Sequence, residues 1–321
     1  MPADRARRQA AVLALLACLA GAAILAFMTL DLRGRLDFVL PLRATKLATL
    51  LLVAYAVAVS TVLFQTVTQN RILTPAVMGL DSLYVLIQTV AVFLLGGAVF
   101  GGLDKRLMFL IETAAMMLFA GLLYRALFAE ERRSLDQLLL AGVVIGIFFR
   151  SLSGLLQRMI DPNDFVALQG KLFASFNTVD RSLLAVGAVL ILAVTVLGWR
   201  MRHVFNVLAL GRDPSIALGV EHRREVSRIL MLIAVLVSVS TALVGPVTFF
   251  GLLVANLAYH LVPTYRHAAI LPAAVLVAVI CLVGGQVVLE RVFSSAAALS
   301  IVIEFVGGIV FIILLLRGFL R

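Results

Sequence analysis

The chain is poor in the residues that build disulfide frameworks, metal centres and soluble surfaces. Its 321 residues include only two cysteines, Cys18 and Cys281, and each lies inside an apolar run without a paired partner spacing. This pattern predicts neither a disulfide framework nor a metal site. Charged residues make up only 14% and hydrophobic residues 63%, whereas soluble domains are about a quarter charged. Lipid is therefore the expected solvent for most of the chain.

Motifs of bond-making chemistry are also missing. The sequence has no GxxxxGK[ST] phosphate loop, no HExxH and no GxSxG. The longest polar connections are 31–46, 157–181 and 201–227, and none is long enough to enclose a core of its own. A membrane enzyme such as a prenyl or phosphoryl transferase would need acidic or histidine residues clustered near one face, and no such cluster is present. We expect no catalytic residue, no metal and no cofactor in this chain.

The formal net charge of +10 does not indicate nucleic-acid binding. The basic residues stand between long apolar runs, which is typical of charges that anchor helix ends at a membrane surface. The expected contact is therefore with membrane lipid, and no nucleic-acid partner is expected.

Long apolar segments predict about ten membrane-spanning helices. A span needs about 20 apolar residues, and the uncharged stretch from Ala10 to Leu30 is longer than the core of a secretory signal. Between Ile229 and Tyr265 there is no Asp, Glu, Lys or Arg, and Gly245-Pro246 supplies a break between two helices. The sequence predicts an all-α membrane protein with a single transmembrane domain over 1–321. The candidate spans are 10–30, 47–67, 82–103, 107–128, 135–156, 182–200, 228–244, 247–262, 268–289 and 297–317.

The distribution of basic residues predicts the orientation of the chain. An even number of spans places both termini on one side. If that side is cytoplasmic, the inner segments hold more than half of the 27 Lys and Arg residues. The densest basic segment, from Arg200 to Arg228, then lies inside as well, as the positive-inside rule requires.

Two polar segments interrupt this pattern. In 208–220, Asp213-Pro214 predicts the start of a short helix, with Asp as the cap and Pro at the first position, and Gly219 predicts its end. Such a helix would be a rigid lever at the membrane surface; the alternative is an ordinary loop. In 65–82, Thr74-Pro75 and Gly79 break the helical pattern. Irregular backbone is tolerated away from lipid, so this segment either lines a cavity or forms a plain turn.

Three motifs resemble those of the FecCD-type permeases of iron-siderophore and cobalamin ABC importers. The third is Gly245-Pro-Val-Thr-Phe-Phe-Gly-Leu252, and the second is the segment Leu208–Val220, with Ser215 where Ala is usual. The first motif begins with a pair of arginines in the family, and here Lys46 stands in place of the second one. The interval between the proline and the final glycine of this motif is also slightly shifted. Its residues here are Arg43, Lys46, Ser60, Gln65, Asn70 and Gly79.

One departure points to a branch of this family. Many members continue the third motif with Pro-His-x-x-Arg, whereas this chain has Ala255-Asn256-Leu-Ala-Tyr259. Together with Arg71–Tyr84 and Thr264–His267, this resembles the branch associated with catecholate siderophores. The resemblance implies a permease for a ferric catecholate siderophore in the bacterial inner membrane. Another iron chelate, haem or cobalamin remains open as the cargo. An ion-coupled secondary transporter, which would need no ATPase, is a further alternative.

The resemblance also implies a fold and partners. Members have ten helices with the fold of the cobalamin-importer permease, a type II ABC importer, in which the second to fifth and seventh to tenth helices form related halves. Two permeases, identical or paralogous, work with a cytoplasmic ATPase dimer that binds ATP and Mg, and with an extracytoplasmic substrate-binding protein. The ATPase docks on the loop between the sixth and seventh helices. The coupling residues implied here are Leu210, Gly211, Arg212, Asp213, Pro214, Ser215, Leu218 and Gly219.

Two further sets of residues are candidates. Arg43, Lys46 and Arg291 are expected on the outer side, where they either dock the binding protein or anchor helix ends. Glu112 and Glu304 lie inside apolar runs, where carboxylates face protein or water; the alternative is a structural hydrogen bond. The four histidines, His203, His222, His260 and His267, fall at cytoplasmic helix ends and are interpreted as interfacial residues. The candidates for the translocation path are Ser60, Gln65, Gln88, Glu112, Asn256 and Glu304.

Overall fold

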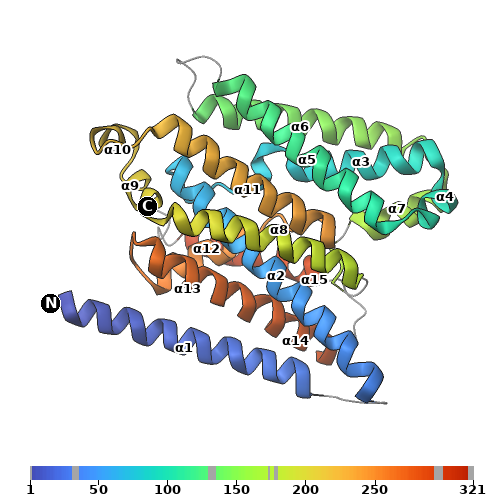
Figure 1. Cartoon of the computed structure of the whole chain (residues 1–321). Helices are drawn as coiled ribbons and strands as arrows, with labels where there is room; N and C mark the ends of the chain where they lie inside the picture. Colours follow the sequence, from blue (N-terminus) through green and yellow to red (C-terminus); the bar gives the residue numbers. More distant parts are fainter. Residues whose placement is uncertain are drawn as a thin grey trace.

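The computed structural model describes residues 2–30, 36–128, 135–172, 174–176, 180–292 and 299–316, and the regular structure in these ranges is helical (Figure 1). Seven helical stretches are long and apolar enough to cross a membrane. They are α1 (Pro2–Thr29), α2 (Leu36–Thr68), α5 (Lys105–Phe128), α6 (Leu135–Gln157), α8 (Arg181–Arg200), α11 (His222–Val244) and the continuous stretch of α13 (His267–Val279), the π-helical turn η2 (Ile280–Gly284) and α14 (Gly285–Val292).

The remaining helices are shorter. Two of them, α3 (Leu80–Leu95) and α12 (Phe250–Leu261), are apolar, and each follows an interruption of the chain. The others are η1 (Pro75–Met78), α4 (Gly97–Gly102), α7 (Pro162–Leu172), α9 (Arg202–Leu208), α10 (Arg212–Ala217) and α15 (Leu299–Leu316). Every predicted span overlaps one or more of these helices, so the all-α membrane fold is confirmed.

Two predicted boundaries are wrong in detail. The expected span 82–103 is broken at Gly96, where φ is +75° and the backbone N–H bonds to the Val92 carbonyl at 2.9 Å. Only glycine adopts this conformation at little cost, so α3 ends at Leu95 and α4 starts in a new direction. The span expected at 47–67 begins at Leu36, because α2 continues through Pro41.

The break predicted at Gly245-Pro246 is confirmed. Helix α11 ends at Val244, Gly245 has φ of +97°, and α12 begins only at Phe250. The second predicted interruption is present as well. Gly79, with φ of +80°, separates η1 from α3, and a Cβ placed on Gly79 would lie 3.0 Å from the Cα of Gly146 on α6. Gly79 is therefore required by both its conformation and its close packing.

Helices α2 and α11 form the centre of the bundle. They pack against each other, α11 also packs on α5 and α8, and α2 also packs on α13. Their facing side chains, among them Val53, Ala54, Ile233 and Ala234, are fully buried. Large apolar side chains such as Leu118, Leu192 and Trp199 point outward and are exposed. An apolar core with an apolar exterior is the arrangement expected of a helix bundle in lipid.

The bundle has two ends that matter for function. In Figure 1 the N-terminus of α1 lies at the left, on the same side as α9 and α10, while α14, α4 and α7 lie toward the right. We call these ends the α10 face and the α14 face. The segment 208–220 and the N-terminus therefore share one face, as the topology prediction requires.

Candidate functional site

The coupling segment 208–220 forms a short helix bounded by two left-handed glycines. Helix α10 begins at Arg212 after Gly211, whose φ is +97°, and Gly219 follows its end with φ of +83°. The end at Gly219 is confirmed. The predicted start is wrong: Asp213 and Pro214 occupy the second and third helical positions, and the capping residue is Gly211, which offers no side chain. The backbone of Gly211 makes the turn itself, so no side-chain cap is used.

Neither glycine is needed for space. A Cβ added at Gly211 or Gly219 would meet no atom within 4 Å. Glycine is therefore required at these two positions for its backbone conformation, because any other residue would be strained at these φ values.

Large apolar side chains are exposed on the outer surface of the coupling segment, beside the charged Arg212 and Asp213. Leu210, Ile216 and Leu218 are 59%, 51% and 62% exposed. On the inner side, Ser215 is buried, and its hydroxyl lies 2.7 Å from the Arg212 carbonyl and 2.8 Å from Nδ1 of His222 on α11. The segment is thus fixed to the bundle on one side and presents large apolar side chains on the other, which is typical of a protein-binding surface.

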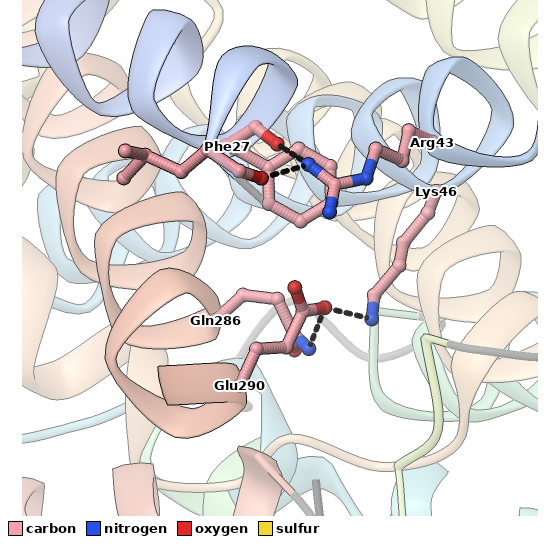
Figure 2. Close-up of polar contacts among 6 residues, drawn as sticks. Phe27, Arg43, Lys46, Gln286 and Glu290 are labelled. Carbon is pink, nitrogen blue, oxygen red and sulfur yellow. Dashed lines mark hydrogen bonds and ion pairs between the residues drawn. The ribbon is translucent and has the colours of Figure 1, made fainter. Parts of the chain in front are cut away.

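The α14 face brings together the three predicted docking residues. Arg43 Nη1 donates hydrogen bonds to the carbonyl oxygens of Phe27 and Leu30, at 2.7 and 2.6 Å, and Figure 2 shows Arg43 beside Phe27. These carbonyls end α1 and lack partners within the helix, so Arg43 holds α1 against α2. Arg291 is exposed and lines the same small cavity as Arg43.

Lys46 is engaged in an ion pair that the sequence did not reveal. Its Nζ lies 2.7 Å from Oε1 of Glu290 on α14, and Gln286 Nε2 donates to the same oxygen at 2.9 Å (Figure 2). The side chains of Lys46 and Glu290 are only 18% and 28% exposed. Arg43 and Lys46 therefore connect helices, and of the three predicted residues Arg291 is the exposed one.

The six predicted path residues do not form one site. Gln88 Nε2 donates to Glu112 Oε1 at 2.7 Å, and this buried pair joins α3 to α5. Gln65 and Asn256 instead converge on the Arg71 carbonyl, at 2.8 and 3.4 Å, close to the α10 face. Each of these three contacts connects neighbouring elements of the bundle.

Ser60 lines a different feature, a small cavity of about 30 Å³ where the two interrupted segments meet. Thr74, Pro75 and Ala76 contribute from one interruption, and Gly245, Val247 and Thr248 from the other. The expectation that the irregular segment 65–82 lines a cavity is thus confirmed. This volume has room for about two water molecules.

Asp81 is a residue that the sequence reasoning missed. It lines this cavity from the first turn of α3 and hydrogen-bonds to Thr241 on α11. Thr248, which lines the same cavity, donates a 3.4 Å bond to Glu304 on α15. Asp81 lies within the Arg71–Tyr84 motif, but that motif assigned it no role of its own, because only the fold brings α3 and α11 together at this cavity.

In the described ranges, no group of three or more His, Cys, Asp or Glu side chains could hold a metal ion. Cys18 and Cys281 are free cysteines.

Comparison with known proteins gives one family and several full-length relatives. The profile of the FecCD transport family matches residues 9–317. The chain is 46% identical over 305 residues to the petrobactin import system permease protein YclO of Bacillus subtilis, covering 95% of this chain and 96% of the relative. It is 34% identical over 278 residues to the petrobactin import system permease protein FatC of Bacillus anthracis, covering 86% and 78%.

A solved structure shares the fold. It is described as an inward-facing conformation of a metal-chelate type ABC transporter, and it superposes with a TM-score of 0.82 over 96% of this chain and 99% of that one, at 23% identity. The permease fold expected from the sequence motifs is therefore confirmed.

Proposed function

The chain belongs to the FecCD transport family, and from this premise we propose that it is the permease subunit of an ABC importer for a ferric catecholate siderophore in the bacterial cytoplasmic membrane. The observation that carries the cargo class is the relative that is 46% identical over 95% of the chain, which is a petrobactin import permease. The catecholate-branch motifs at Arg71–Tyr84 and Thr264–His267 support the same cargo.

The energy for transport comes from a separate ATPase dimer that binds ATP and Mg and docks on the coupling segment. Three features of that segment support this role: its rigid glycine boundaries, its exposed Leu210, Ile216 and Leu218, and its attachment to α11 through Ser215. The orientation follows. The α10 face and both termini are cytoplasmic, and the α14 face is extracytoplasmic.

The substrate-binding protein docks on the α14 face. Arg291 supplies an exposed positive charge for acidic residues of the binding protein, while Arg43 and Lys46 hold the helices that form the platform. The translocation path runs between this chain and a second permease, identical or paralogous. Single-domain organisation over 1–321 is part of the same proposal.

The decisive experiment is reconstitution in proteoliposomes with the partner permease, ATPase and binding protein. Uptake of radiolabelled iron as a catecholate chelate should require ATP and all partners. A hydroxamate chelate, haem and cobalamin serve as alternative cargoes in parallel. Uptake of one of these in preference to the catecholate would overturn the cargo, and uptake by this chain under an ion gradient without ATPase would overturn the importer mechanism.

A further inference from the structure

Helix α9 is fastened to two spanning helices by a compact set of hydrogen bonds. It connects α8 to the coupling segment, so α10 is joined to the bundle through α9 on one side and through α11 on the other. The set consists of Asn206 and the Leu208 carbonyl on α9, Thr66 and Gln69 at the end of α2, and His267 at the start of α13. We call these five residues the α9 clasp.

Asn206 serves as the cap of a helix that starts 61 positions later. Its Oδ1 accepts the backbone N–H of His267 at 2.9 Å and lies 2.9 Å from the ring Nδ1 of the same residue. The residue in the capping position, Arg266, makes no side-chain cap. Since an amide oxygen only accepts, the imidazole carries a proton on Nδ1. The Oδ1 atom of Asn206 on α9 thus binds both the first backbone N–H of α13 and the imidazole ring of His267.

The other edge of the imidazole reaches α2. Nε2 of His267 lies 2.8 Å from Oγ1 of Thr66, and the same hydroxyl lies 2.9 Å from the Val62 carbonyl on its own helix. Both side chains are buried. The ring also packs edge-to-face on Phe205 of α9, with centroids 5.7 Å apart. A single buried side chain therefore connects α9, α13 and α2, while Asn206 itself is exposed.

Gln69 links α2 directly to the turn that enters α10. Its Nε2 donates to the Leu208 carbonyl at 2.9 Å and to the Thr66 carbonyl at 2.7 Å. The Leu208 carbonyl also accepts the N–H of Gly211 at 3.0 Å, so the amide of Gln69 and the glycine turn share one oxygen. Gln69 itself has φ of +51°, a conformation that a non-glycine residue keeps only when its surroundings hold it.

We propose that the α9 clasp transmits movement of the coupling segment to α2 and α13, with His267 and Gln69 as the positioning residues. This inference rests on the proposed coupling role of α10. Because the clasp joins the base of α10 to the ends of two spanning helices, a push on α10 tilts those helices instead of sliding α9 across the bundle. The physical requirement is a connected network between the two sites, and the clasp supplies its first link.

The test measures cargo moved per ATP hydrolysed in the reconstituted transporter. His267→Phe keeps a ring against Phe205 but removes both ring nitrogens, and Thr66→Val removes the hydroxyl at nearly constant volume. The matched control is Thr68→Val: the Thr68 hydroxyl donates to the Phe64 carbonyl of its own helix, at 2.8 Å, as the Thr66 hydroxyl does to the Val62 carbonyl. We expect His267→Phe to lower the transport-to-ATPase ratio about five-fold, with Thr68→Val unchanged. In the double variant, Thr66→Val should add little to His267→Phe, because the two act in one network.

A merely structural role gives a different result. Thermal stability and the yield of assembled transporter would then fall, while the transport-to-ATPase ratio of the assembled fraction stayed normal, and the proposal would be overturned. Hydrogen exchange in the unmodified transporter provides a second test that needs no variant. Nucleotide should change protection in α9, the last turn of α2 and the first turn of α13 together, and a change in α9 alone would also overturn the clasp. If the unmodified transporter shows no ATP-dependent uptake, the proposed function fails first.

Discussion

The ammonium group of Lys46 lies 2.7 Å from a carboxylate oxygen of Glu290, a residue 244 positions later in the chain. This ion pair joins the first half of α2 to α14 on the α14 face, beside the bonds from Arg43 to the end of α1 (Figure 2). A basic residue that the motif suggested as a docking contact is thus neutralised within the subunit.

Releasing Lys46 from Glu290 should strengthen docking of the binding protein. Glu290→Gln keeps the size of the side chain but removes the charge, so Lys46 becomes available to acidic partners. We expect affinity for the binding protein to rise about two- to five-fold at low salt, and the gain to shrink at high salt. Stability should change by no more than about 1 kcal/mol, because the pair is partly exposed. Affinity measured by surface plasmon resonance checks this, and a loss of affinity in Glu290→Gln would contradict it.

Arg43 and Arg291 should separate into a stability role and a docking role. Arg43→Ala leaves the carbonyls of Phe27 and Leu30 without their donor, so we expect a loss of about 1–3 kcal/mol in unfolding free energy. Arg291→Glu should leave thermal unfolding nearly unchanged and weaken binding-protein affinity about ten-fold at low salt. The idea of an Arg291 contact is lost if that affinity does not move.

Substituting the glycines that bound α10 should uncouple ATP hydrolysis from uptake. Gly211→Val and Gly219→Val place a β-branched residue at positive φ, where even an ordinary side chain costs about 1–2 kcal/mol, so the segment adopts another shape. ATPase activity should persist while uptake falls at least about ten-fold. Gly21→Ala is the control, because Gly21 lies within α1 and has open space around it. Normal uptake in both valine variants would rule out a rigid lever.

The exposed apolar residues of the coupling segment should be needed for assembly and not for folding. Ile216→Asp and Leu218→Asp introduce charge at exposed positions, so the fold should remain intact while an apolar contact with the ATPase is lost. Co-purification of the ATPase with the permease should drop strongly, while Ala217→Ser, on the same short helix, should have no effect. Full recovery of the ATPase with both aspartate variants would place its docking surface elsewhere.

Glu112 and Gln88 should behave as one structural unit. Glu112→Leu leaves the Gln88 amide buried without its acceptor, which costs about 1–3 kcal/mol. The double variant Gln88→Leu/Glu112→Leu removes both partners, so it should be more stable than Glu112→Leu alone. Thermal unfolding of the single and double variants makes the comparison. A path role would be indicated instead if Glu112→Gln kept stability and abolished uptake.

Much of the candidate site was accessible from local sequence. Gly219 predicts a left-handed end of the segment, and the basic residues from Arg200 to Arg228 predict its side of the membrane. The predicted start of α10 was wrong because Asp213-Pro214 is a favourable cap and first helical position on propensity alone. In the structure the turn at Gly211 lets the helix begin already at Arg212. Propensity is a weak guide to boundaries when backbone geometry on either side decides them.

The sequence by itself determined that this chain is embedded in a lipid bilayer, that it folds into helices, and that the helices are interrupted at Gly79 and Gly245. The first two properties follow because long apolar segments are more stable in lipid than in water. The breaks follow because the backbone preferences of proline and glycine act within a few residues. Only the tertiary structure decided that Asn206 caps the helix of His267, that Glu290 neutralises Lys46, and that Asp81 lines a cavity together with Ser60 and Thr248. These contacts join residues far apart in the chain, and no local pattern specifies a partner whose position depends on how the whole bundle packs.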